Sequence, residues 1–299
     1  MKDQAHTLRR IFEEGPSRTP EVLSVTSGKG GVGKTSIVVN MGILLASRGK
    51  KVIVLDADLG LANVDVMLGI APKLTIKHVL DGQCPIEDIV LTGPAGVKII
   101  PASSGIQELA DLNPEQQISL VNALDHFDGD FDYLIIDTGA GISRNVMYFN
   151  AASQRVIVVA TAEPTSITDA YALIKVLRKH YGIKRFDLIV NNVTSKVEGD
   201  HVAEKLIMVC DRFLGDVALE MLGSIPHDKS IPECIKEQKA FVGVHPTSDA
   251  TKRLARIVGR LEESTKTSPG GNLQFFFRKM LLNQAKGTSH AGYRVHGTY

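Results

Sequence analysis

Residues 28–36 read Gly28-Lys29-Gly30-Gly31-Val32-Gly33-Lys34-Thr35-Ser36 and lie between an apolar run at 22–26 and apolar positions with helical spacing at 37–45. The G-x-x-x-x-G-K-[ST] spacing is typical of a loop whose backbone N–H groups surround phosphate oxygens, because glycines permit the turns that this requires. In such a loop Lys34 reaches the β- and γ-phosphates and the Thr35 hydroxyl can bind Mg²⁺. The order of strand, loop and helix therefore predicts a nucleotide site at residues 28–36.

The same loop contains a second lysine, Lys29, directly after its first glycine. One cation is enough for the β- and γ-phosphates of the loop's own nucleotide. Lys29 could instead reach the phosphates of a nucleotide held by a facing subunit, as a cation supplied in trans does. The alternative interpretation is a solvated loop lysine with no role in catalysis.

The composition indicates a globular protein with a substantial core. Of 299 residues, 43% are hydrophobic and 22% are charged, and the net charge of +1 predicts no general attraction to nucleic acid. Three cysteines without C-x-x-C spacing give no sign of a disulfide framework or a zinc or iron–sulfur site. No apolar run approaches the 18 or so residues that a membrane-spanning helix needs.

From residue 21 to 263 apolar strands alternate with helical patterns. We expect strands near 22–27, 52–56, 97–100, 133–137, 155–160, 186–190 and 217–225, and helices near 34–48, 114–126, 166–181, 201–214 and 247–262. This alternation predicts one α/β domain at 21–263, a mainly parallel sheet with helices on both faces. Residues 1–20 and 264–299 are expected to be appended segments.

Carboxylates close two of the expected strands: Asp56 and Asp58 at the second, and Asp137 at the fourth. A carboxylate at the end of a buried strand is costly to bury unless it meets a cation or ordered water. Ligands of parallel sheets bind at the carboxyl ends of the strands, so these residues are candidates for a magnesium site beside the loop. For Asp56 and Asp58 the alternative is a turn that caps the next helix.

Both ends of the chain carry short amphipathic segments. Residues 3–12 have apolar positions at helical spacing, followed by a linker rich in Pro, Gly and Ser. Residues 264–299 contain five Lys and Arg and no Asp or Glu, so this tail carries +5 and the remainder of the chain −4. Within it one helical stripe is formed by Leu273, Phe276, Phe277, Met280 and Leu281. At 12 residues, segment 273–284 is too short to cross a bilayer; it is predicted to lie on a membrane surface, or else to pack on the protein's own core.

These motifs resemble a known family. The loop with its second lysine resembles the deviant Walker A motif of the ParA/MinD ATPases. The strand ends at Asp56–Asp58 and Asp137, together with the C-terminal stripe, resemble the MinD branch of the SIMIBI P-loop ATPases. Asp3-Gln4-Ala5 with Leu8-Arg9, and Asp137-Thr138-Gly139-Ala140-Gly141, resemble the FlhG/FleN flagellar-number ATPases.

The resemblance implies an enzyme that hydrolyses ATP with Mg²⁺, and it assigns roles to particular residues. Lys29, Lys34 and Asp58 would be catalytic, with Asp58 orienting the attacking water. Thr35, Asp56 and Asp137 would form the magnesium shell. The nucleotide would be bound by residues 28–36 and its adenine by Asn191 and Pro226; an asparagine after a strand is otherwise a common turn residue.

The resemblance also implies partners and a location. The protein would be a homodimer with ATP, lying in the cytoplasm and peripherally on the inner face of the cytoplasmic membrane, in some members at a pole. It would act on the GTPase FlhF through Asp3, Gln4, Leu8 and Arg9, and in some bacteria on flagellar switch components or the regulator FleQ. Two alternatives are a cell-division MinD, which would lack the N-terminal helix, and a ParA-type partition protein. The latter would require a basic DNA-binding surface and no apolar stripe.

Overall fold

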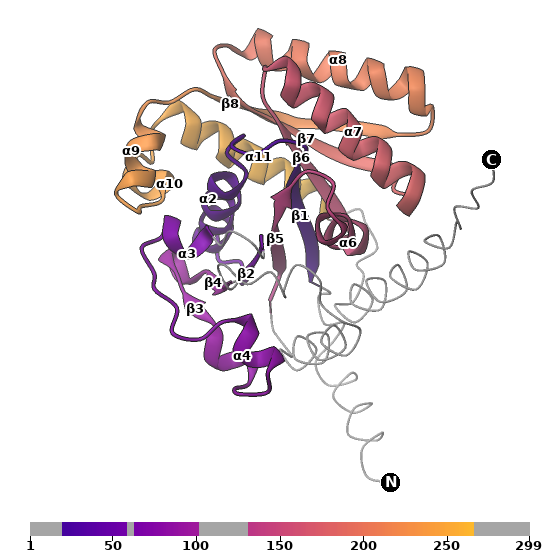
Figure 1. Ribbon diagram of the computed structural model, residues 1–299. Helices are drawn as coiled ribbons and strands as arrows, with labels where there is room; N and C mark the ends of the chain where they lie inside the picture. The colour runs from indigo at the N-terminus through magenta and orange to yellow at the C-terminus, as the bar shows by residue number, and fades with distance from the viewer. Residues whose placement is uncertain (1–19, 59–62, 102–130, 266–299) are drawn as a thin grey trace, which may run out of the picture.

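The computed structural model describes residues 20–58, 63–101 and 131–265. Within these ranges eight strands form one sheet, in the order β3-β4-β2-β5-β1-β6-β7-β8 (Figure 1). The strands are β1 (Glu21–Ser27), β2 (Val52–Ala57), β3 (Leu91–Thr92), β4 (Lys98–Ile100), β5 (Tyr133–Ala140), β6 (Arg155–Ala160), β7 (Arg185–Val193) and β8 (Ala218–Pro226). All neighbouring pairs are parallel except β3 with β4. The predicted α/β class with a mainly parallel sheet is confirmed.

Helices cover both faces of the sheet (Figure 1). The longer ones are α2 (Lys34–Ser47), α6 (Arg144–Ala152), α7 (Pro164–Tyr181), α8 (Lys196–Leu214) and α11 (Asp249–Thr265). The shorter ones are α3 (Val64–Met67), α4 (Ile76–Leu80), α9 (Ser230–Lys236), α10 (Phe241–Val244) and the 3₁₀ turns η1 (Ile86–Ile89) and η2 (Pro94–Gly96). Helices α2 and α11 pack on one face, and α6, α7 and α8 pack on the other.

Successive side chains of a strand point to opposite faces of the sheet. In β1, Leu23 and Val25 join the core beneath α2 and α11, whereas Val22 joins the core on the other face. In β5, Ile135 likewise faces α2, and its neighbours Leu134 and Ile136 face away. Because both faces of a parallel sheet are covered, its strands are continuous apolar runs, which is why they could be located in the sequence.

Several elements differ from the prediction. The two-residue strand β3 and the helices α3, α4, α6, α9 and α10, of nine residues or fewer, were not predicted, since segments of this length carry little periodic signal. Helix α8 begins at Lys196 and not near 201, with Ser195 capping it by accepting the Glu198 N–H. Glycine within a helical pattern usually lowers the expectation of a helix, and Gly199 lies in the first turn of α8. A Cβ at Gly199 would lie 2.7 Å from the Cβ of Ser224, so the glycine allows α8 to approach β8 closely. The helix predicted at 114–126 lies outside the described residues.

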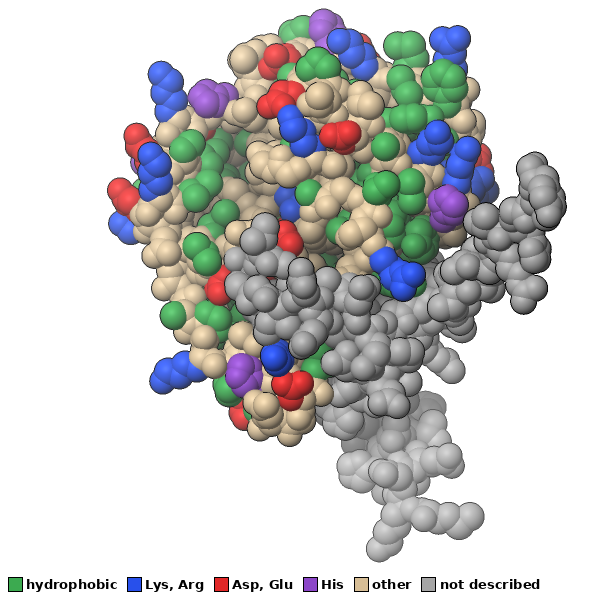
Figure 2. All heavy atoms as spheres, in the orientation of Figure 1, with side chains coloured by type: hydrophobic (Ala, Val, Ile, Leu, Met, Phe, Trp, Pro, Cys, Tyr) green, Lys and Arg blue, Asp and Glu red, His purple; other side chains and the backbone are tan. Residues whose placement is uncertain are grey.

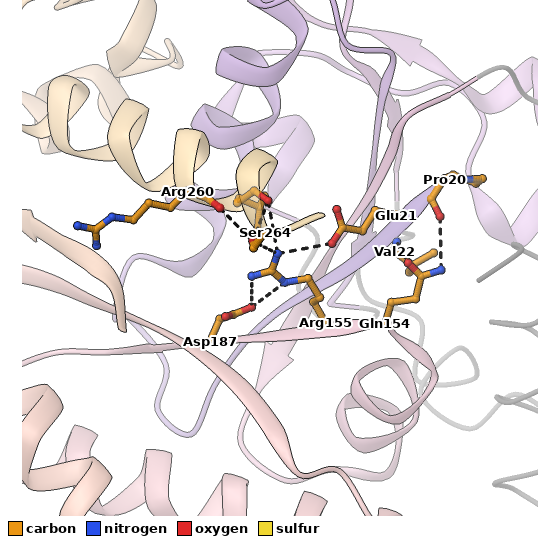
Figure 3. A network of polar contacts seen from close by, with 9 residues as sticks. Pro20, Glu21, Val22, Gln154, Arg155, Asp187, Arg260 and Ser264 are labelled. Carbon is orange, nitrogen blue, oxygen red and sulfur yellow. Dashed lines mark hydrogen bonds and ion pairs between the residues drawn. The ribbon is translucent and has the colours of Figure 1, made fainter. Parts of the chain in front are cut away.

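Arg155 joins helix α11 to the amino edge of the sheet (Figure 3). The Arg155 guanidinium donates to Asp187 at 2.9 Å and to the Ser264 hydroxyl at 2.6 Å, and lies 3.6 Å from Glu21. The network joins β1, β6 and β7 to the end of α11. Its position at the opposite end of the strands from residues 28–36 leaves the carboxyl edge of the sheet to the candidate site.

Candidate functional site

The loop at residues 28–36 joins the carboxyl end of β1 to the start of α2, as predicted. Gly31 and Gly33 have φ angles of 77° and 89°, a region that residues with a side chain rarely adopt. Gly28 is required for a different reason, because a Cβ there would lie 2.2 Å from the backbone of Asp169 in α7. Gly33 is the N-cap of α2 and offers no side chain to its first turn, so those N–H groups can bind an anion.

Three charged side chains meet beside this loop. Asp56 of β2 and Asp137 of β5 are direct partners in the parallel ladder, so their side chains are neighbours on the same side of the sheet. Lys34 Nζ lies 3.5 Å from Asp137 Oδ1, and the Lys34 side chain is 9% exposed. Each aspartate is only 1% exposed. Two buried carboxylates with one ammonium group leave an excess of negative charge that a divalent cation would neutralise.

The two carboxylates have different surroundings. Asp56 accepts three backbone N–H groups, from Asp58 at 3.1 Å, Asn63 at 2.9 Å and Val64 at 3.1 Å, and thereby also caps α3. The polar neighbours of Asp137 are the Lys34 ammonium, at 3.5 Å, and the Thr35 side chain, and both act to lower its pKa. Burial is the main cause that raises the pKa of both groups, to about 7 for Asp56, with the Asp137 charge adding to it.

The charges and burial of Asp56 and Asp137 fit a bound Mg²⁺. Two buried carboxylates that share one lysine ammonium require further positive charge, which a divalent cation and its waters would supply. In residues 20–58, 63–101 and 131–265 no three His, Cys, Asp or Glu side chains form a metal-binding group. Mg²⁺ does not need one, because it usually keeps several waters and binds through one or two carboxylates plus substrate phosphates. The residues that could hold it are Thr35, Asp56 and Asp137.

The pKa of Asp56 predicts how stability depends on pH without metal. The folded-state pKa of about 7 exceeds the ordinary value of 3.8, so between these values the folded state binds more protons and its stability falls as pH rises. Across this window, in EDTA, wild type should lose about 1–3 kcal/mol relative to Asp56→Asn, whose side chain stays neutral. Urea unfolding of both proteins at pH 5 and pH 7.5 measures this. Parallel pH profiles would contradict it.

Asp58 lies on the same side as the magnesium candidates. Its side chain is half-buried, and a Cβ on Gly139 would lie 3.5 Å from its Oδ1. The Asp58 charge also contributes to the raised pKa of Asp137. The structure therefore brings Asp58, Asp137 and the end of β5 together. This is a position from which a carboxylate could orient water near the terminal phosphate.

Lys29 is held by Glu163 and Thr165, which no sequence motif had indicated as site residues. Its Nζ donates to Glu163 and, at 3.0 Å, to the Thr165 hydroxyl, both at the start of α7. Lys29 and Glu163 are 37% and 63% exposed, so the ion pair contributes little to stability and is easily exchanged. The signal that could have revealed the contact is Glu163-Pro164, because proline favours the first position of a helix, here at the carboxyl edge of β6.

Asn191 and Pro226 lie at the carboxyl ends of β7 and β8. The Asn191 amide donates to the Val32 carbonyl at 2.8 Å and so contacts the phosphate loop directly. Pro226 is half-buried, and its ladder partner is Val193. Asn192 and His227, the residues that follow these two, were not predicted as site residues.

The expected contacts at the two chain ends lie outside the described residues. This applies to Asp3, Gln4, Leu8 and Arg9 and to Leu273, Phe276, Phe277, Met280 and Leu281. Among the helices that are described, none has the length and apolarity to cross a bilayer.

Known proteins resemble this chain over most of its length. A family profile described as an AAA domain matches residues 20–189. The antiactivator FleN of Pseudomonas aeruginosa is 42% identical over 92% of this chain and 98% of its own length. The flagellum site-determining protein YlxH of Helicobacter pylori is 34% identical over 87% of this chain and 89% of its own. The septum site-determining protein MinD of Pyrococcus horikoshii, solved with Mg-ADP, has the same fold, with a TM-score of 0.67 and 23% identity over 82% of this chain and 97% of its own. The chain therefore belongs to the FlhG/FleN group of the MinD/ParA family of P-loop ATPases, enzymes that hydrolyse ATP with Mg²⁺.

Proposed function

We propose that this ATPase regulates flagellar number and placement through an ATP-dependent dimer that binds the inner face of the cytoplasmic membrane. The observation that carries the flagellar assignment is the 42% identity to an antiactivator, FleN, that extends over 98% of that protein. The relative YlxH is a flagellum site-determining protein, which supports the same assignment.

Each residue of the site has a proposed task in hydrolysis. Bound ATP and Mg²⁺ supply the reacting phosphate and neutralise its charge. The N–H groups of residues 28–36 and the Lys34 ammonium bind the phosphates, while Thr35, Asp56 and Asp137 hold the metal and its waters. Asp58 orients the attacking water, and Asn191 and Pro226 contact the adenine.

Dimerisation would bring Lys29 to the second nucleotide. In one chain, Lys29 is held by exposed contacts with Glu163 and Thr165 at the start of α7. Such contacts are worth at most about 1 kcal/mol, so a nucleotide phosphate on a facing subunit could replace them. We infer that Lys29 acts in trans. The ADP form would then be monomeric and the ATP form dimeric.

The C-terminal stripe is proposed to make membrane binding depend on that dimer. Burying five large apolar side chains gives on the order of 10 kcal/mol, and ordering about twelve residues opposes this by a similar amount. One copy would therefore bind weakly. Two linked copies would bind much more strongly, because the second contact is intramolecular.

Sedimentation with anionic liposomes tests this proposal. Full-length protein should pellet with a nonhydrolysable ATP analogue and stay in solution with ADP, whereas a chain ending at Thr267 should stay in solution with both. A full-length protein that ignored liposomes in both states would refute the membrane assignment. Phe276→Ala with Phe277→Ala is the milder variant, since it removes apolar area and retains the positive charge.

The N-terminal segment is the proposed site for FlhF. We expect Gln4→Ala to reduce stimulation of the FlhF GTPase. ATP hydrolysis by the same variant should be unchanged, and this measurement is the control. Direct binding of nucleic acid is not part of the proposal. Among the described residues on the face in Figure 2, Lys and Arg side chains are interspersed with Asp and Glu and form no continuous basic patch.

A further inference from the structure

Two adjacent asparagines at the end of β7 connect the phosphate loop to the segment that follows β8. The Asn191 amide donates to the Val32 carbonyl at 2.8 Å. Asn192 Oδ1 lies 2.7 Å from His227 Nδ1, and the His227 backbone N–H donates to the Val193 carbonyl at 2.8 Å. His227 is therefore fixed at both its backbone and its ring, although its side chain is exposed.

The backbone at Asn192 departs from a regular strand. Its φ angle is 59°, and the ladder between β7 and β8 shifts register between Val190 and Val193. Residues other than glycine adopt this left-handed conformation infrequently, asparagine more often than most, and such residues collect at binding and catalytic sites. Here the conformation accompanies the Asn192 contact with His227.

The order of strands indicates which part of a nucleotide would lie near this pair. The buried carboxylates Asp56 and Asp137 are on β2 and β5, to one side of β1 and its loop, and they mark the metal and terminal-phosphate end. Strands β6, β7 and β8 lie on the other side of β1. The ribose and base must extend away from the terminal phosphate, and so toward the ends of β7 and β8.

We propose that His227, oriented by Asn192, recognises the 6-position of the adenine base and selects ATP over GTP. With the Asn192 amide oriented so that its oxygen faces Nδ1, that oxygen can only accept a hydrogen bond, and we assign the proton of a neutral His227 ring to Nδ1. Nε2 then carries a lone pair and accepts. The 6-amino group of adenine can donate a hydrogen bond to this acceptor. The 6-oxo group of guanine is itself an acceptor, so its lone pairs would repel the lone pair on Nε2. This inference rests on ATP binding at the phosphate loop and adds a residue for base selection.

Equilibrium binding of Mg·ADP and Mg·GDP at pH 8 tests the proposal by calorimetry, without reference to hydrolysis. His227→Ala should weaken ADP binding about 5- to 10-fold, as expected for one lost hydrogen bond, and leave GDP binding unchanged or slightly tighter. His227→Gln should restore most of the ADP affinity, because its amide oxygen can take the place of Nε2. Asn192→Ala should have an intermediate effect, since the ring then loses its orientation. The control is His180→Ala, an exposed histidine at the other end of α7.

Two results would overturn the assignment. Equal loss of ADP and GDP affinity in His227→Ala would mean that the residue supports the loop and does not read the base. Unchanged affinity for both would mean that it does not touch the nucleotide. In either case tight ADP binding by wild type would leave the ATPase itself intact, so failure of this inference is distinct from failure of the phosphate site.

Discussion

Mixing Lys29→Ala protein with Asp58→Ala protein is expected to restore ATP hydrolysis that neither variant shows alone. If Lys29 acts on the partner's nucleotide, one site of the mixed dimer combines an intact Asp58 with the intact Lys29 of the other subunit. The second site lacks both. Random pairing of equal amounts makes half of the dimers mixed, so about one quarter of the wild-type activity should return.

The single variants provide the baseline. Asp58→Ala should bind ATP and dimerise but hydrolyse about 10²- to 10⁴-fold more slowly, because water orientation and proton transfer are lost while the phosphate loop is untouched. Lys29→Ala should also be slow, by about 10³-fold or more, as for an in-trans cation. Lys205→Ala, an exposed lysine of α8, controls for loss of charge.

Complementation distinguishes the two interpretations of Lys29. If the lysine served its own nucleotide, both sites of the mixed dimer would be defective and mixing would restore nothing. If it were only a solvated partner of Glu163, Lys29→Ala would be active by itself. Wild-type turnover by Asp58→Ala would refute the water-orienting role.

Asp137→Asn is expected to abolish most hydrolysis while leaving the fold nearly as stable as in wild type. The polar neighbours of Asp137 are the Lys34 ammonium and the Thr35 side chain, and the oxygen of an asparagine amide can still accept from them. The substitution also removes a negative charge beside Asp56, which partly offsets the lost pairing with Lys34. We expect a change of at most about 1 kcal/mol in the free energy of unfolding.

The loss should appear in the response to magnesium. Without the Asp137 charge, Mg²⁺ is held less firmly and hydrolysis should fall roughly 100-fold or more at millimolar Mg²⁺. The thermal stabilisation that Mg·ADP gives to wild type should shrink toward that of ADP alone. Asp211→Asn, an exposed aspartate, is the matched control. An unchanged magnesium dependence would show that Asp137 does not belong to the metal site.

The local sequence was sufficient for the phosphate loop and the class of fold. Gly31 and Gly33 adopt the left-handed conformations that only glycine accepts readily. The backbone geometry of the loop therefore dictates the glycine spacing within residues 28–36, which is visible in the sequence. Strands buried on both faces are continuous apolar runs, which made β1, β2, β5, β6 and β7 visible. The rule that carboxyl ends of parallel strands share an edge placed Asp56 and Asp137 near the loop.

Only the tertiary structure decided which of these residues touch and in what state. Strand register makes Asp56 and Asp137 neighbours, and burial raises the pKa of both. The contacts of Lys29 with Glu163 and of Asn192 with His227 join residues 134 and 35 positions apart. Local periodicity reports which face of an element is apolar, and it carries no information on which distant side chain lies opposite. Those pairings follow from how the sheet and its helices pack.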